Sequence, residues 1–351
     1  MRRDRSRRYT RWPDPDRGEA AGSVTFLEES VNMKRMLTGV LVGAALCLAG
    51  PLAAQTTTRL AIGTGGTGGV YYPLGGGMAS ILSKHVKGWE ATAEVTGASV
   101  ANLQLIGQGK QDFGFTMADS AYDATQGTGK FKSHPVEART LMVLYPNKMQ
   151  AVTVAGSGIE TLADFKGKRI STGEPNSGTE VMALRLLEAA GIAKDVSRER
   201  LSVAEGVNAI KDRKIDGLIW VGGVPTAALT DLAATPGLTI KLLDHAQYAD
   251  ALNKKWGPLY VKGSVAAGSY KGQDKDVGNI DVWNLLVADK KMSDDMAYTI
   301  VKTLMEHKDE LVAVHREAKN ITLEAQAAGS PIPMHPGARK YFEERGVKFP
   351  N

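Results

Sequence analysis

The hydrophobic positions early in the chain group into a strand, a polar glycine loop and a helix. Residues 60–62 form a short apolar run typical of a buried strand, and apolar side chains recur at helical spacing from Leu74 to Leu82. Between them, residues 63–69 contain only glycine and threonine, and Pro73 suits the first turn of the helix. A strand, a glycine loop and a helix start in this order aim free backbone N–H groups at an anion.

The same plan returns in the second half of the chain. A loop over residues 174–180, with the capping-box spacing Ser177-x-x-Glu180, precedes a helical pattern over residues 181–190. Residues 110–115 and 214–220 occupy corresponding places, since each follows a helix, enters a strand and ends in a loop of small residues before another helix. Two similar α/β lobes with facing loops predict a cleft between them.

The apolar runs also predict where the chain passes between the lobes. Strands over residues 141–145 and 150–154, interrupted by Pro146, mark the first crossing, and a strand over residues 282–287 marks the return. One long helix is expected over residues 296–317, because apolar side chains form a stripe along it.

The N-terminal segment differs from the rest in composition. Residues 1–32 are rich in arginine and have no apolar period, which indicates a disordered extension or a misassigned start codon. Residues 33–54 have the basic start, apolar core and small residues of a secretory signal peptide. The remaining chain is assigned as residues 55–148 plus about 278–351 for lobe one and residues 149–277 for lobe two.

Removal of the signal peptide changes the charge of the protein. The chain has 43 basic and 38 acidic residues, a net charge of +5, and nine of the basic and six of the acidic residues precede Gln55. The mature chain would therefore keep a net charge of +2 with no basic stripe, which argues against a nucleic-acid partner. A signal peptide without a further apolar run of membrane-spanning length predicts a periplasmic protein.

The sequence offers little catalytic or metal-binding chemistry. Cys47, the single cysteine, lies within the predicted signal peptide, so the mature chain is expected to have no thiol chemistry. The six histidines are scattered without the spacing of metal ligands, and no Ser/His/Asp arrangement can be read. We therefore expect no enzyme activity, no cofactor and no metal.

The glycine loop permits one enzymatic alternative. Gly63, Gly65 and Gly68 match the dinucleotide fingerprint G-x-G-x-x-G, which would make the protein an exported oxidoreductase. That fingerprint also needs an acid about 20 residues further on, at the end of a second strand. Glu90 and Glu94 are near this position, but the pattern places Glu94 at the start of its strand and not at the end, which disfavours this alternative.

Eight segments, in order and spread over nearly the whole chain after Gln55, carry a family resemblance: 62–73, 95–99, 119–122, 162–168, 177–180, 215–220, 267–270 and 331–337. With these segments the chain resembles the solute-binding subunit of TAXI-family TRAP transporters. The resemblance implies a type II periplasmic binding-protein fold, with two α/β lobes joined by a hinge and a ligand cleft between them.

The resemblance also implies a function. Such a protein captures a small carboxylate, such as glutamate or a related five-carbon dicarboxylate, and delivers it to a TRAP membrane permease driven by an ion gradient. The better-known TRAP receptors clamp the carboxylate with an arginine, and no arginine is found in the loops expected to line this cleft. A binding component of an ATP-driven importer with the same fold is the nearer alternative.

The candidate ligand contacts lie where loops meet helices. Helix N-termini and hydroxyl groups can hold a carboxylate without a counter-charge. Some positions keep a structural alternative: Ser99 also suits a helix cap, Tyr72 and Tyr122 also suit packing beside the hinge, and Trp220 also suits the core. The predicted contacts are Thr64, Gly65, Tyr72, Ser99, Asn102, Tyr122, Asn176, Ser177, Gly178, Thr179, Trp220 and Gly222.

Overall fold

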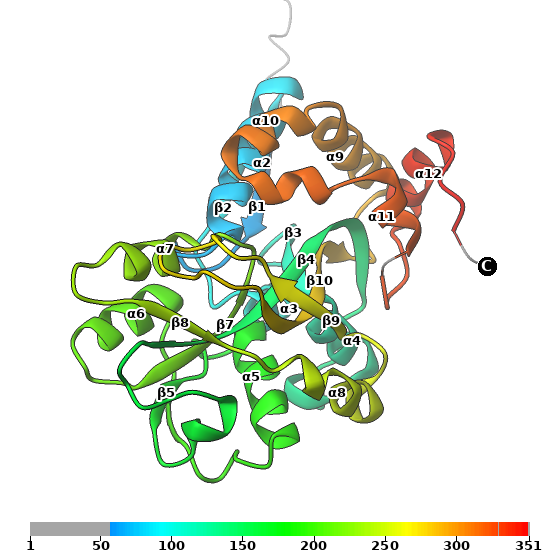
Figure 1. Cartoon of the computed structure of the whole chain (residues 1–351). Coiled ribbons are helices and arrows are strands. Elements are labelled where there is room, and N and C mark those ends of the chain that lie inside the picture. The colour runs from blue at the N-terminus through cyan, green and yellow to red at the C-terminus, as the bar shows by residue number, and fades with distance from the viewer. Residues whose placement is uncertain (1–56, 329, 350–351) are drawn as a thin grey trace, which may run out of the picture. The chain divides into compact units, whose positions relative to one another are not determined.

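A mixed sheet of ten strands organises the computed structural model, which describes residues 57–328 and 330–349 (Figure 1). Eight of the strands follow the order β2-β1-β3-β10-β4-β7-β5-β6, while β8 pairs with β4 and β9 pairs with β10. The predicted α/β fold class is therefore confirmed. The predicted signal peptide and the segment over residues 1–32 lie outside the described residues.

The first end of the sheet is built from three parallel strands. β1 pairs with β2 on one side and with β3 on the other. Helices connect these strands, as a parallel arrangement requires. The elements are β1 (Thr58–Gly63), α2 (Tyr71–His85), β2 (Trp89–Glu94), α3 (Ser99–Gly107), β3 (Phe113–Met117), α4 (Ala118–Gln126) and η1 (Gly129–Phe131).

Two long antiparallel strands, β4 (Ala138–Val154) and β10 (Val277–Asp289), form the middle of the sheet. The prediction of two strands separated at Pro146 is wrong, because β4 continues through this residue. Pro146 pairs with Trp283 beside an irregularity in the register. Bulges of this kind accommodate a proline, which cannot donate to the ladder.

The second end of the sheet again contains parallel strands. β5 pairs with both β6 and β7, and β7 pairs antiparallel with β4. The elements are η2 (Leu162–Phe165), β5 (Arg169–Ser171), α5 (Gly178–Ala189), β6 (Ser197–Glu199), α6 (Val203–Lys211), β7 (Gly217–Gly222), α7 (Ala227–Ala234), β8 (Ile240–Leu243), η3 (Ala246–Tyr248), α8 (Ala249–Trp256) and β9 (Val261–Val265).

The C-terminal helices return to the first end of the sheet. The single helix predicted over residues 296–317 is wrong: α9 (Asp294–Glu306) ends at His307, whose φ of −113° and ψ of 25° leave the helical range. A shorter helix, α10 (Lys308–Val314), follows and packs against Gly77 of α2. The chain then forms η4 (Arg316–Asn320), α11 (Leu323–Ala328) and α12 (Pro336–Glu344).

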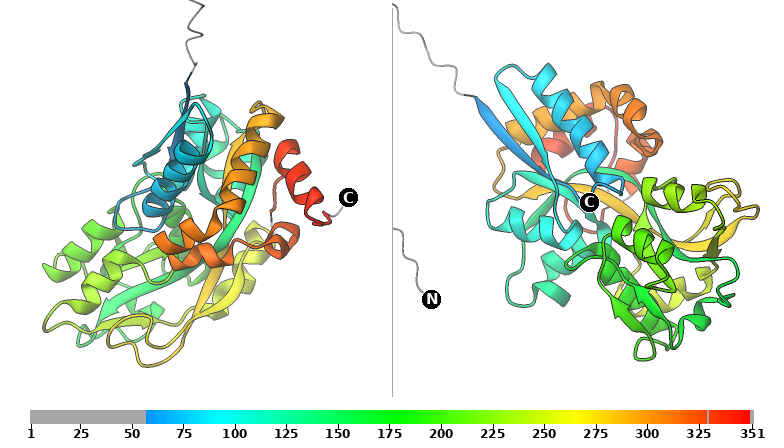
Figure 2. Two further views of the ribbon diagram at one scale, coloured as in Figure 1. Left: turned by 90° about the horizontal axis from the view of Figure 1, so that it is seen from above. Right: turned by 90° about the vertical axis from the view of Figure 1, so that its left-hand side faces the viewer.

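The helices gather in two groups. In Figures 1 and 2, α2 and the C-terminal helices cover the β1–β3 end of the sheet, while α5, α6 and α7 lie at the β5–β7 end. Leu74, Ile300 and Phe342 are buried in the first group, and Leu218 and Leu229 in the second. This arrangement has the element order of the two predicted lobes, whose boundaries remain a prediction. Within the described residues, no helix combines the length and hydropathy of a membrane span.

Candidate functional site

A cavity lies where the two groups of elements meet, with about 410 Å³ of empty space, part of it open to solvent. Only about 30 Å³ of it can hold the centre of a water molecule, which is well below the several hundred Å³ of a typical small-molecule site, so a solute can enter only if the walls move apart. Its walls come from the glycine loop and α2, the start of α3, the end of β3, the middle of β4, the start of α5 and the end of β7. The lining residues are Gly65, Gly66, Gly69, Val70, Tyr71, Ala98, Ser99, Met117, Tyr145, Asn147, Glu174, Ser177, Gly178, Thr179, Trp220, Val221 and Gly222.

Three helices begin at this cavity. α2, α3 and α5 start at Tyr71, Ser99 and Gly178, and all three residues line it. In α5, the Ser177 Oγ accepts the N–H of Glu180 at 2.9 Å, while the N–H groups of Gly178 and Thr179 belong to the first turn and have no partner within the helix. These groups and the positive ends of three helix dipoles favour an anion.

Buried polar side chains form the base of the cavity. The Tyr145 hydroxyl and Asn147 Oδ1 are both buried without a hydrogen-bond partner. Asn147 Nδ2 donates to Asn284 Oδ1 at 2.7 Å, and the Tyr71 hydroxyl donates to the same oxygen. An unpaired buried polar atom costs free energy, so Tyr145 and Asn147 are suited to contact a polar solute.

Glu174 is the only ionisable acid or base, apart from the tyrosines, among the lining residues that the structure describes. Burial, followed by the nearby charge of Glu205, raises the pKa of Glu174 to about 7. The cavity wall therefore gains a negative charge as the pH rises through neutrality. No arginine or lysine faces it from the described lining, in agreement with the loop sequences.

The two sides of the cavity are in close contact. A Cβ atom on Gly178 would lie 2.2 Å from Met117 Cε and 2.7 Å from Ser99 Oγ, on the opposite wall. The glycine loop is equally close to the other side, since the N–H of Ala228 donates to the Gly68 carbonyl at 3.3 Å. Only residues without side chains permit this approach.

Seven predicted contacts line the cavity: Gly65, Ser99, Ser177, Gly178, Thr179, Trp220 and Gly222. The local role of Ser99 differs from the predicted cap, because Ala98 is the N-cap residue of α3 and the Ser99 Oγ accepts the N–H of Met117 at 3.1 Å. Thr179 Oγ1 accepts the N–H of Val221 at 3.3 Å. Both hydroxyl groups keep a proton to donate.

Five predicted contacts do not line it: Thr64, Tyr72, Asn102, Tyr122 and Asn176. Thr64 and Asn102 are buried and hold the loop instead, since Asn102 Nδ2 donates to the Thr64 carbonyl at 2.7 Å. Tyr72 is 38% exposed, and its neighbour Tyr71 takes the position expected for it. Asn176 adopts a φ of 62° in the turn before α5.

Ten lining residues were missed by the sequence analysis: Gly66, Gly69, Val70, Tyr71, Ala98, Met117, Tyr145, Asn147, Glu174 and Val221. Asn147 could have been predicted from the sequence, because it is a polar residue within the apolar run of β4. The remainder are apolar residues, glycines or loop residues whose place depends on how the sheet folds.

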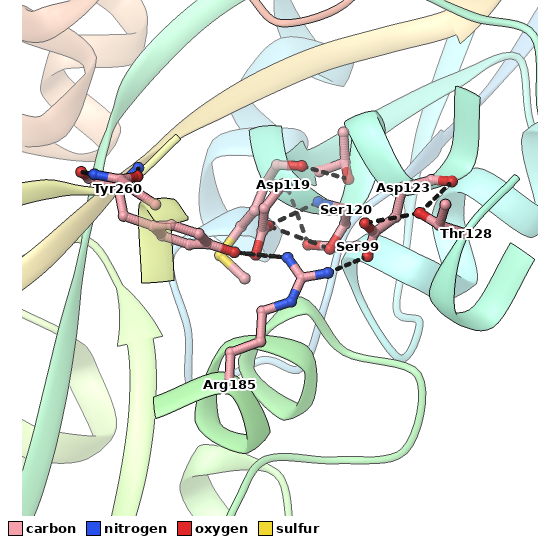
Figure 3. A network of polar contacts seen from close by, with 10 residues as sticks. Ser99, Asp119, Ser120, Asp123, Thr128, Arg185 and Tyr260 are labelled. Carbon is pink, nitrogen blue, oxygen red and sulfur yellow. Dashed lines mark hydrogen bonds and ion pairs between the residues drawn. The ribbon is translucent and has the colours of Figure 1, made fainter. Parts of the chain in front are cut away.

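A buried ionic network lies beside the cavity, between α4 and α5 (Figure 3). Arg185 pairs with Asp119 at 3.3 Å and with Asp123, and it donates to the Tyr260 hydroxyl at 2.6 Å. The Tyr260 hydroxyl in turn donates to Asp119 at 2.9 Å. Burial raises the pKa of Asp119, and the charge of Arg185 opposes this rise. Each polar group of the network thus has a partner, as buried charges require.

The structure corrects one argument against a dinucleotide site. Glu94 is the last residue of β2, so its predicted place at the start of a strand is wrong. The glycine loop itself opposes the alternative, because a Cβ on Gly69 would lie 3.1 Å from the Trp220 ring. At Gly69, the last residue of the loop, the other side of the cavity therefore lies in close contact.

A family model described as the NMT1-like family matches residues 62–346. The chain belongs to the NMT1-like family. This match runs from the end of β1 to beyond α12 and includes all segments that line the cavity.

Solved structures with low sequence identity are similar in fold. A protein from Bordetella bronchiseptica RB50 has a TM-score of 0.52 at 16% identity, over 83% of this chain and 99% of its own. The periplasmic aliphatic sulphonate binding protein SsuA from Escherichia coli has a TM-score of 0.44 at 15% identity, over 82% and 83%. A putative L-cystine ABC transporter protein from Listeria monocytogenes has 0.46 at 14% identity, over 76% and 96%.

The last two of these structures are named for binding or transport. The expectation that this chain is not an enzyme agrees with its family membership. The role of this chain as a solute-binding protein and its specificity are matters for proposal.

Proposed function

We propose that the protein is an exported binding protein that captures a small carboxylate in the cavity and delivers it to a membrane transporter. The convergence of three helix N-termini on one cavity without a lysine or arginine in its described lining supports this most directly. A carboxylate can accept the N–H groups of Gly178 and Thr179 and the hydroxyl protons of Ser99 and Thr179.

Closure of two lobes around the solute is part of this proposal. The lobes would comprise residues 55–148 plus about 278–351 and residues 149–277, with β4 and β10 crossing between them. The contacts of Gly178 with Ser99 and Met117 join the two sides and would form only in the closed state. Opening would separate them and admit the solute.

The class of transporter has two candidates. The sequence motifs favour a TRAP permease driven by an ion gradient, with glutamate or a related dicarboxylate as solute. Similar solved proteins that name a transporter class name ABC transporters, which favours the ATP-driven importer kept as the alternative. We give preference to the ATP-driven importer, and uptake in cells separates the two: an ionophore stops a TRAP system, whereas depletion of ATP at constant ion gradient stops an importer.

A thermal-shift screen tests the solute class. The panel comprises amino acids, C4–C6 dicarboxylates and alkanesulfonates, each checked by isothermal titration calorimetry. A true solute present at about 100 times its Kd stabilises the protein by roughly 2.7 kcal/mol. No response to any carboxylate in the panel would contradict the proposed solute class, while binding of an uncharged sugar or a polyamine would contradict the anion site itself.

A further inference from the structure

Two histidines and one glutamate meet on the surface of the first group of helices, and one of the histidines is more than 200 residues from the other two side chains. His85 is the last residue of α2, His307 lies at the junction of α9 and α10, and Glu310 is in the first turn of α10. One nitrogen of each imidazole and one carboxylate oxygen all lie within 4.8 Å of one another. This set of donors is typical of zinc and related dications.

The distances within the cluster suit a common metal ion. Glu310 Oε1 is 2.8 Å from His85 Nε2 and 3.4 Å from His307 Nδ1. Ligands about 2.0–2.1 Å from a tetrahedral ion are separated by about 3.3 Å, so the observed distances match neighbouring corners of a tetrahedron. At least one imidazole ring would have to turn to bring the three atoms around one ion, because a metal lies in the plane of each ring that binds it.

The surroundings affect a bound cation in different ways. Lys84 Nζ contacts the other oxygen of Glu310, Oε2, at 3.2 Å, which leaves Oε1 toward the histidines, while the positive charge of Lys84 opposes a nearby cation. The two imidazole rings are stacked with centroids 3.5 Å apart and 14° between their planes, so metal binding requires one ring to leave the stack. His85 is at a helix C-terminus, where the dipole attracts cations.

The three side chains are partly exposed to solvent. Their exposed fractions are 24% for His85, 33% for His307 and 41% for Glu310, so an ion can enter from solvent and keep a water molecule as its fourth ligand. We propose that His85, His307 and Glu310 bind one zinc-class dication that joins α2 to the α9–α10 junction. The site is independent of the solute cavity, which lies at the other end of α2.

Zinc and cobalt titrations of the untagged full chain test the proposal. The parent protein carries Cys47→Ser, which removes the only thiol, and is stripped with EDTA before use. We expect one Zn²⁺ per chain by calorimetry with a Kd in the micromolar range or below, and Co²⁺ absorption bands of low coordination number. Saturating Zn²⁺ is expected to raise the thermal midpoint, because it binds only the folded arrangement.

Three variants and a matched control locate the ion. His85→Ala, His307→Ala and Glu310→Gln are each expected to weaken Zn²⁺ binding about tenfold or more. His134→Ala removes an exposed histidine outside the cluster and should leave the affinity unchanged. Thermal midpoints in EDTA show whether each variant folds. If an alanine variant is unstable, the Zn²⁺ affinity of Glu310→Gln, which keeps an oxygen near Lys84, is used to judge the proposal. Absence of saturable binding by the parent, or parental affinity in both histidine variants, overturns the proposal.

Discussion

Replacement of Gly178 by alanine would test whether the described contacts across the cavity belong to a closed state. Gly178 is the first residue of α5, and its backbone has no positive φ that would exclude a side chain. The added methyl group would lie 2.2 Å from Met117 Cε, 2.7 Å from Ser99 Oγ and 3.0 Å from Ser99 Cβ. In an open state, where these residues separate, the methyl group would meet solvent.

The size of the effect follows from these distances. Favourable contacts between carbon atoms lie at about 3.5–4.0 Å, so every one of these contacts is too short. The end of Met117 can rotate away, but Ser99 is held by the N–H of Met117 and cannot. Overpacking of this kind costs about 1–3 kcal/mol, which corresponds to a loss of roughly 5- to 150-fold in solute affinity.

The measurement compares affinity with stability in the absence of solute. Calorimetry with the best solute of the panel gives the Kd, and Trp220, which lines the cavity, gives an independent fluorescence signal. Denaturant unfolding without solute should show no loss, because alanine is better than glycine in a helix by about 1 kcal/mol. Gly76→Ala is the matched control, since a Cβ there meets nothing within 4 Å in α2.

Two outcomes would refute this reasoning. An affinity within twofold of the parent and an unchanged stability would mean that closure does not bring Gly178 against Ser99. A loss of stability without solute at unchanged affinity would mean that the protein is closed whether or not solute is bound, because the strain would then be present in both states. The Gly76→Ala control should be stabilised slightly and bind normally.

Three further predictions concern buried polar groups. Glu174→Gln should flatten the pH dependence of stability and of anion binding, because the raised pKa of about 7 means that the wild-type carboxyl favours folding below its usual pKa and that this advantage is lost as the pH rises to 7 and above. The wild-type free energy of unfolding and anion affinity should therefore both fall over this interval, while those of the variant stay level. Parallel pH profiles of the two proteins would contradict this prediction. Arg185→Ala should lower the free energy of unfolding by about 3–5 kcal/mol in denaturant titrations, because Asp119 would remain buried without its cation. A loss below about 1 kcal/mol would show that the Arg185–Asp119 pair contributes little to stability. Tyr145→Phe should leave stability unchanged or raised, since its hydroxyl has no partner, and should weaken solute binding by roughly tenfold; unchanged affinity would remove Tyr145 from the site.

The sequence alone determined the class of fold and several of the loops that line the cavity. Residues 60–62, the glycine loop and the apolar stripe of α2 are local patterns, and local geometry follows from them with little influence from distant residues. Ser177 likewise caps α5 as its spacing predicts, because a capping bond needs only the next few residues. Seven of the twelve predicted contacts line the cavity for this reason.

Local patterns failed where distant partners decide the outcome. Pro146 remains inside β4 because the bulge beside it forms only when β4 pairs with β10 at Trp283, which is distant in sequence. Glu94 ends its strand because β1 sets the register of β2. Tyr71 faces the cavity instead of Tyr72 because Asn284, more than 200 residues away, accepts its hydroxyl proton.

Tertiary structure also created sites for which the chain has no motif. The spacing of the histidines showed no metal ligand set, yet the packing of α2 against α10 brings His85 to within 2.8 Å of Glu310. Tyr145 and Asn147 reach the cavity only because β4 runs between the two groups of helices. A sequence pattern specifies what one element can do, whereas a site shared by several elements exists only once packing has fixed their positions.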